Sequence, residues 1–171
     1  MTGLKRTPRS RGGFTLVELL CAIIVLLLLA ALLTLGVRTA VTAFGRSMAA
    51  SEAQTLLSTL RTGVSDELRY SGTVRLATDG TPAGFFSRSY GEAAYSGFSS
   101  DERGHVLLGV EKLLPDRAYP HGLCAEVKLT AYDAVTGTFT VQITVYTARA
   151  PNLAQTEFET KQLNPAAILT E

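Results

Sequence analysis

The sequence has only two cysteines, Cys21 and Cys124, among its 171 residues. Cys21 lies within an apolar run and Cys124 lies in the later, more polar part, so we do not expect them to bond within one chain. Two isolated cysteines cannot supply the disulfide framework on which many small secreted domains depend. We therefore expect Cys124 to be a small buried residue, and any extracytoplasmic location has to be argued from topology.

Signatures of catalysis and of metal binding are also missing. The sequence has no serine nucleophile elbow, glycine-rich phosphate loop or paired-carboxylate motif. His121 and Cys124 have a spacing that a metal could use, but two ligands without a partner pair do not make a zinc site. We expect His105 to be a surface or rim residue at the start of a strand, and Asp101 and Glu102 to be solvated charges. The sequence predicts a protein that is not an enzyme and holds no metal or cofactor.

The sequence has no strong excess of charge of either sign. Its formal net charge is +1, with 16 Lys and Arg against 15 Asp and Glu. Four of the positive charges precede residue 14, so a chain that begins there has a net charge of −3, from 12 positive and 15 negative side chains. A mildly acidic chain lacks the basic surface expected of a nucleic-acid-binding protein, and we expect no direct nucleic-acid contact.

Residues 14–37 contain no Lys, Arg or Asp, and Glu18 is their one carboxylate. As a helix these positions span about 36 Å, enough to cross a bilayer core of roughly 30 Å. A carboxylate inside such a run is costly unless it finds a partner, so Glu18 is a candidate functional residue. Lys5, Arg6, Arg9 and Arg11 precede the run, and the positive-inside rule places them in the cytoplasm and the C-terminal part outside.

Two simpler interpretations of this segment remain open. A secretory signal peptide could be cut near Val41-Thr42-Ala43, although the apolar run is longer than the 7–15 residues usual for such a peptide. A plain signal anchor explains the basic flank and the apolar run but leaves Glu18 without a role.

The sequence from Gly13 to Glu18, Gly-Phe-Thr-Leu-Val-Glu, followed by about twenty apolar residues, resembles the class III signal of type IV pilins and pseudopilins. The resemblance covers residues from about Lys5 to Leu35. It implies that a prepilin peptidase cuts after Gly13 and methylates the new amino terminus at Phe14. It also implies that Glu18 is the glutamate used in filament assembly.

After Val37 the apolar residues continue at helical spacing, which predicts an amphipathic helix. No proline lies between Thr15 and Thr81, and Gly45 and Gly63 weaken a helix without ending it. We therefore expect one helix from Phe14 to Tyr70, ended by Ser71-Gly72. The expected stripe consists of Val37, Val41, Phe44, Met48, Leu56, Leu60, Val64 and Leu68.

The stretch from Thr73 to Ser100 is harder to interpret. Residues 73–86 could form a short hairpin that turns at Asp79-Gly80, and the glycines and serines after it predict a loop. The aromatic residues of this loop could be a contact surface, or they could simply pin the loop to the domain. They are Phe85, Phe86, Tyr90, Tyr95 and Phe98.

Beyond Gly104 the apolar period becomes two, which is typical of strands. Residues 105–110 read as a strand, and residues 123–132 and 138–147 as an antiparallel pair. Pairing Ala131 with Phe139 and Val127 with Ile143 places every apolar residue on one face. A turn at Pro151 then leads to an edge strand at 156–163.

We therefore expect an α+β fold in which a long N-terminal helix packs on a small antiparallel sheet. The divisions are a cleaved cytoplasmic leader (1–13), a transmembrane assembly helix (14–37), an amphipathic helix (38–70) and an extracytoplasmic head (71–171).

The resemblance implies a single-pass inner-membrane subunit, held in lipid until it is polymerised into a pilus or a secretion or competence pseudopilus. It also implies as partners the prepilin peptidase, other subunits, an assembly ATPase and a platform membrane protein. The alternatives are a scarce tip subunit that binds or adheres, and a simple membrane-anchored domain.

Overall fold

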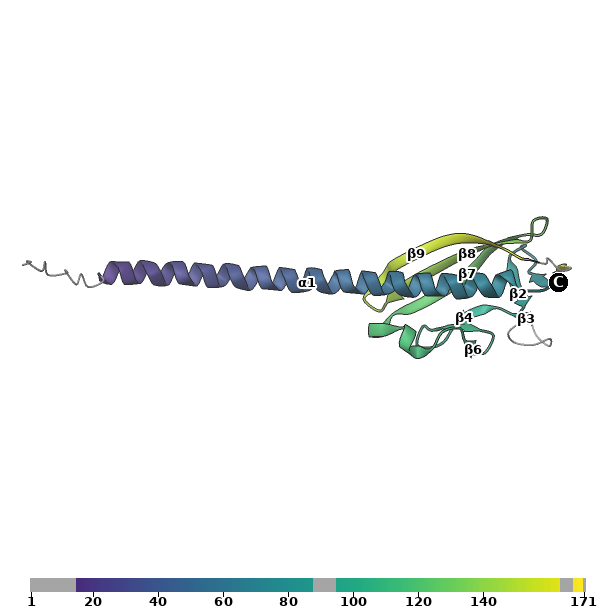
Figure 1. Ribbon diagram of the computed structural model, residues 1–171, viewed down its shortest axis with the longest axis horizontal. Helices are drawn as coiled ribbons and strands as arrows, with labels where there is room; N and C mark the ends of the chain where they lie inside the picture. The colour runs from purple at the N-terminus through teal and green to yellow at the C-terminus, as the bar shows by residue number, and fades with distance from the viewer. Residues whose placement is uncertain (1–14, 88–94, 164–167, 171) are drawn as a thin grey trace, which may run out of the picture. The chain divides into compact units, whose positions relative to one another are not determined.

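The computed structural model describes residues 15–87, 95–163 and 168–170. The leader, Gly13, Phe14 and Tyr90 lie outside the described residues. The chain divides into two compact units, residues 1–45 and 46–171. Helix α1 (Leu16–Arg69) contributes to both, and every strand belongs to the second unit, the head (Figure 1).

Helix α1 is continuous over its 54 residues, as the sequence predicts, and its bounds lie within two residues of the expected ones. In the first unit its apolar side chains are exposed all round, from Leu16 (80% exposed) to Val41 (66% exposed). The hydroxyl of Thr34 donates to the Ala30 carbonyl oxygen at 2.8 Å, so this polar group of the apolar run is satisfied within the helix. By length and composition α1 contains a stretch able to cross a membrane.

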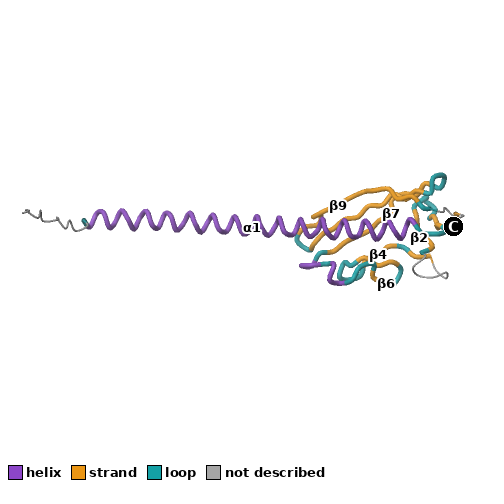
Figure 2. Tube along the Cα trace, in the orientation of Figure 1, coloured by secondary structure: helices purple, strands orange, loops and turns teal. Residues whose placement is uncertain are grey.

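The head contains three small sheets (Figure 2). Strands β7 (Cys124–Asp133), β8 (Thr138–Thr147) and β9 (Ala150–Lys161) form an antiparallel sheet in the order β7-β8-β9. A second sheet has the order β10-β1-β2-β3, from β1 (Val74–Leu76), β2 (Pro82–Phe86), β3 (Tyr95–Ser96) and β10 (Ile168–Thr170). The third consists of β4 (Phe98–Ser100), β5 (Val106–Leu108) and β6 (Glu111–Lys112). Two 3-10 turns, η1 (Asp116–Ala118) and η2 (Pro120–Gly122), lead into β7.

The core of the head lies between the last five turns of α1 and the inner face of the β7-β8-β9 sheet. The buried residues of the helix are Ala53, Leu56, Leu57, Leu60, Val64 and Leu68. The buried residues of the sheet are Ala125, Val127, Phe139, Val141, Ile143, Val145, Ala154 and Phe158. Each large apolar side chain buried here contributes about 1.5–3 kcal/mol of transfer free energy. The expected one-sided sheet and its helix are therefore confirmed, although the stripe becomes buried only from Ala53 onward.

The register of the central pair is confirmed at one end and wrong at the other. Val127 pairs with Ile143 as predicted, but a bulge between Leu129 and Ala131 shifts the following residues. Phe139 consequently pairs with Tyr132 and not with Ala131. The extra residue turns the tyrosine ring inward, 4.6 Å from the Phe139 ring, and leaves Ala131 exposed. The bulge thus packs a large, half-buried ring against the core in place of a methyl group.

Smaller differences concern the limits of strands. The hairpin over residues 73–86 is confirmed as β1 and β2, with its turn at Asp79-Gly80. Short strands β3 and β4 occupy residues predicted as loop, and the strand predicted at 105–110 is only β5. The predicted edge strand is β9, which begins at Ala150, so Pro151 lies inside the strand and not in a turn. Proline fits an edge strand because one side of that strand has no ladder to which an N–H must donate.

Candidate assembly site at the start of the helix

The predicted functional residues lie around the first turn of α1. Gly13 and Phe14 fall outside the described residues, so their expected roles in cleavage and methylation remain predictions. Glu18 is described, and it lies in the first turn, three residues after Thr15.

Thr15 and Glu18 bind each other reciprocally. The Thr15 backbone N–H and hydroxyl donate to Glu18 Oε2 at 3.2 and 3.1 Å, and the Glu18 N–H donates to Thr15 Oγ1 at 3.3 Å. This arrangement is a capping box, which satisfies N–H groups that the first turn of a helix leaves without partners. Glu18 therefore has a structural role at the helix start in addition to any role between subunits.

Sequence reasoning missed the capping box. Its signal was present as Thr15-x-x-Glu18 directly before an apolar run, which is the pattern of a helix N-terminus. The sequence singles out Glu18 as the one carboxylate of the apolar run and as part of the pilin-like motif, but it gives Thr15 no separate role.

The electrostatics of this turn favour a carboxylate. The N-terminus of a helix carries a partial positive charge, and a negative side chain in the first turn is stabilising there. Both Thr15 and Glu18 are exposed. The carboxylate is thus held in place by its own helix and remains accessible to a second charged group.

The other candidates from the sequence do not form a site. No group of three or more His, Cys, Asp or Glu side chains among the described residues is arranged to hold a metal. His121 Nδ1 instead lies 2.9 Å from Glu52 Oε2. Cys124 is a free, half-buried thiol directed at the Arg103 carbonyl oxygen, 3.4 Å away, so its expected full burial is wrong.

The predictions for His105 and Asp101 are also wrong. His105 is 8% exposed, and its ring stacks on Tyr119 with the ring centroids 4.3 Å apart. Asp101 accepts hydrogen bonds from the backbone N–H groups of Arg103 and His105, so it organises a turn and is not a freely solvated charge. The sequence around them, Asp-Glu-Arg-Gly-His, reads as polar loop and gives no sign of the aromatic ring that covers the histidine.

Comparison with known proteins agrees with the site. Residues 8–34 match the family described as the prokaryotic N-terminal methylation motif. No curated protein and no solved structure matches the chain.

The chain therefore carries a prokaryotic N-terminal methylation motif, which is the motif of type IV pilins and pseudopilins, on a pilin-like α+β architecture. The motif is consistent with a type IV pilin or pseudopilin, and it implies processing by a prepilin peptidase. The apolar N-terminal helix is consistent with membrane anchoring.

Proposed function

We propose that this chain is a type IV pilin-like or pseudopilin subunit that is polymerised through its N-terminal helix into a pilus or a secretion or competence pseudopilus. The observation that carries the proposal is the methylation motif at residues 8–34, together with the part of α1 in the first unit, whose apolar side chains are exposed on all sides. A helix that is hydrophobic all round requires either lipid or the helices of other subunits around it.

Processing precedes assembly in this proposal. The prepilin peptidase cuts between Gly13 and Phe14 and methylates the new amino terminus. Residues 14–37 then hold the subunit in the inner membrane as a single span. The basic leader lies in the cytoplasm, and residues 71–171 lie outside. An assembly ATPase and a platform membrane protein then move the subunit from lipid into the filament.

Glu18 sets the axial position of each subunit in the filament. Its carboxylate meets the positive amine of Phe14 on a neighbour, and the two opposite charges offset the desolvation that each suffers among apolar helices. A carboxylate has about four acceptor positions, so the capping contacts at Oε2 leave positions for the amine. The apolar helix supplies most of the contact area, and the ion pair supplies the register.

The alternative of a tip subunit that binds through its aromatic loop receives no support from the described side chains. Phe85 is fully buried, and Phe98 packs against it with the ring centroids 5.4 Å apart. These two rings pin the loop to the head.

The experiment compares assembly with processing in variants of Glu18. Glu18→Gln removes the charge but keeps a residue that a capping box accepts, so the helix start is preserved. Amino-terminal sequencing should show that the mature protein begins at Phe14 in both wild type and variant. The yield of sheared filaments or pseudopili should fall sharply, because a buried amine without its partner costs roughly 3–5 kcal/mol. Glu102→Gln, an exposed glutamate of the head, is the matched control.

Two results would contradict the proposal. A mature protein that begins near Phe44 would indicate an ordinary secretory signal. Normal filament yield from Glu18→Gln, with equal membrane levels of processed subunit, would reduce Glu18 to a helix cap. Replacement of Gly13 by a bulky residue should separately block the cut and leave the longer form in the membrane.

A further inference from the structure

The segment from Leu113 to Leu123, here named the strap, connects β6 to β7 and includes η1 and η2. The strap is anchored in the core by the buried side chains of Tyr119 and Leu123, which are 6% and 2% exposed. The sequence has two histidines, and each lies within ion-pair distance of a carboxylate where the strap meets another element. His105 faces the strap residue Asp116, and His121 belongs to the strap itself.

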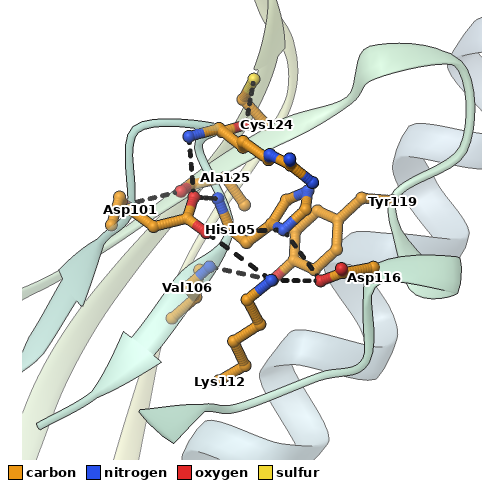
Figure 3. A network of polar contacts seen from close by, with 10 residues as sticks. Asp101, His105, Val106, Lys112, Asp116, Tyr119, Cys124 and Ala125 are labelled. Atoms are coloured by element: carbon orange, nitrogen blue, oxygen red, sulfur yellow. Dashed lines mark hydrogen bonds and ion pairs between the residues drawn. The ribbon is translucent and has the colours of Figure 1, made fainter. Parts of the chain in front are cut away.

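His105 lies between two carboxylates (Figure 3). Its Nδ1 atom is 3.3 Å from Asp116 Oδ1 on the strap and 3.6 Å from Asp101 Oδ2 in its own loop. The face of its ring is covered by Tyr119. This Nδ1 is the one buried side-chain nitrogen or oxygen among the described residues that has no hydrogen bond.

Two other cations lie around the carboxylates. Lys112 of β6 forms ion pairs with Asp116 and, at 3.9 Å, with Asp101. Arg103 is exposed, and its charge contributes to the lowered pKa of Asp116. The hydroxyl of Tyr119 accepts the Val106 N–H at 3.0 Å. The imidazole is therefore the buried member of the cluster, whereas Asp101 is half-buried and Asp116 and Lys112 are exposed.

Both carboxylates keep their charge where an imidazole titrates. The backbone N–H of His105 is the main cause that holds the pKa of Asp101 below its usual value. The hydrogen bond from Lys112 is the main cause that lowers the pKa of Asp116. Nδ1 makes no hydrogen bond to these oxygens, so its effect on them is electrostatic. A neutral imidazole brings no charge to them, whereas an imidazolium brings a positive charge within 3.3 and 3.6 Å.

We propose that His105 is a proton-dependent latch that ties the strap to the β5 side of the head and tightens when the imidazole gains a proton. The latch stabilises the closed strap while the imidazole carries the extra proton and loosens it when that proton is lost. The head would therefore open locally more often in an alkaline medium. This inference stands on the geometry of the head and is independent of filament assembly.

His121 provides an internal comparison. Its pair with Glu52 of α1 has a short distance of 2.9 Å, but the imidazole side chain is 78% exposed. Arg117 is also exposed on the strap. Solvent screens such a pair, so protonation of His121 should change the closure of the strap very little.

The test is hydrogen–deuterium exchange of the full chain in detergent at pH 5.5 and 7.5, with each rate divided by its intrinsic rate at that pH. Peptides from the strap report opening, and a peptide from β8 serves as the internal reference. In wild type the strap should open roughly two- to fivefold more at pH 7.5, the effect of losing one partly exposed ion pair. The same response is expected in His121→Gln, and it should be absent in His105→Gln and reduced in Asp116→Asn.

Two outcomes would overturn the latch. One is equal protection of the strap at both pH values in wild type, and the other is a full response in His105→Gln. If His105→Gln does not fold, His121→Gln decides the matter, because His105 is then the sole histidine. Loss of the pH-dependent opening in His121→Gln would assign this response to His121 and refute the proposal.

Discussion

Gln162 joins the two ends of the head, and its replacement is the sharpest test of how the head is held together. The side chain is 2% exposed. Its Oε1 accepts the hydroxyl of Tyr132 at 2.7 Å, and its Nε2 donates to the Gly72 carbonyl oxygen at 2.7 Å and to Ser71 Oγ at 2.8 Å. The next residue, Leu163, donates its N–H to the Arg69 carbonyl oxygen at the end of α1.

Gln162→Met keeps the length of the side chain and removes its polar atoms. The Tyr132 hydroxyl and the Gly72 carbonyl then lose these hydrogen bonds inside the protein, whereas Ser71 Oγ keeps its bond to the Leu68 carbonyl oxygen. Each of these two half-buried groups costs about 1–2 kcal/mol when it loses its partner, the lower part of the usual range, so the free energy of unfolding should fall by roughly 2–4 kcal/mol. That loss is a large part of the 5–15 kcal/mol typical of a whole protein.

The assay is thermal unfolding of the full chain in detergent, followed by circular dichroism of the head. The loss should lower Tm by about 10–20 °C, from the few degrees that each kcal/mol moves a unit of this size. Gln155→Met, on the exposed face of β9, is the matched control and should change stability by less than about 0.5 kcal/mol. A Gln162→Met protein as stable as wild type would show that Gln162 fills space and does not clamp the head.

Three further changes test other parts of the head. Ile143→Asp places an unpaired charge in the core and should cost several kcal/mol, whereas Gln142→Asp on the outer face should cost little; denaturant unfolding of both checks which face is buried. Gly104→Ala should lower the free energy of unfolding by roughly 2–4 kcal/mol, because its φ is +75° and the new methyl group would lie 2.5 Å from the Cys124 side chain. Gly80→Ala is the control: its φ is also positive but the methyl group would enter open space, so it should cost only about 1 kcal/mol. Wild type should have a higher free energy of unfolding than Asp101→Asn above pH about 3.9, and this difference should disappear as the pH falls through the lowered pKa of the Asp101 carboxyl. Urea unfolding of both proteins between pH 2 and 6 checks the direction of this effect.

Periodicity was sufficient for the helix and for the main sheet. Apolar residues at helical spacing and then at spacing two define one buried face on each element, and only one pairing of these faces forms a core. Spacing alone could not find the bulge near Thr130, because an alternating pattern is equally consistent with a strand that has no extra residue. The bulge depends on which of Ala131 and Tyr132 packs better against Phe139, and this depends on tertiary packing and not on the local sequence.

The polar contacts of the head were harder to foresee than its core. Strands β5 and β6 lie between His105 and Asp116, and no local pattern links a histidine to a carboxylate eleven positions later. The capping box at the helix start can be recognised from the sequence alone, because Thr15 and Glu18 are only three residues apart. The methylation motif predicted from the sequence is confirmed by the family match at residues 8–34, whereas the roles of Gly13 and Phe14 within it remain predictions.

The head closes without a covalent bond between its ends, and this has a consequence for its stability. A disulfide stabilises chiefly by restricting the unfolded chain, whereas the Gln162 contacts exist only in the folded state. Both cysteines are free, and Cys21 lies in the other unit of the chain. A thiol reductant should therefore leave Tm unchanged in wild type and in Gln162→Met alike. A decrease in Tm on adding reductant would reveal a cysteine bond between chains, and part of the stability assigned to the clamp would then belong to that bond.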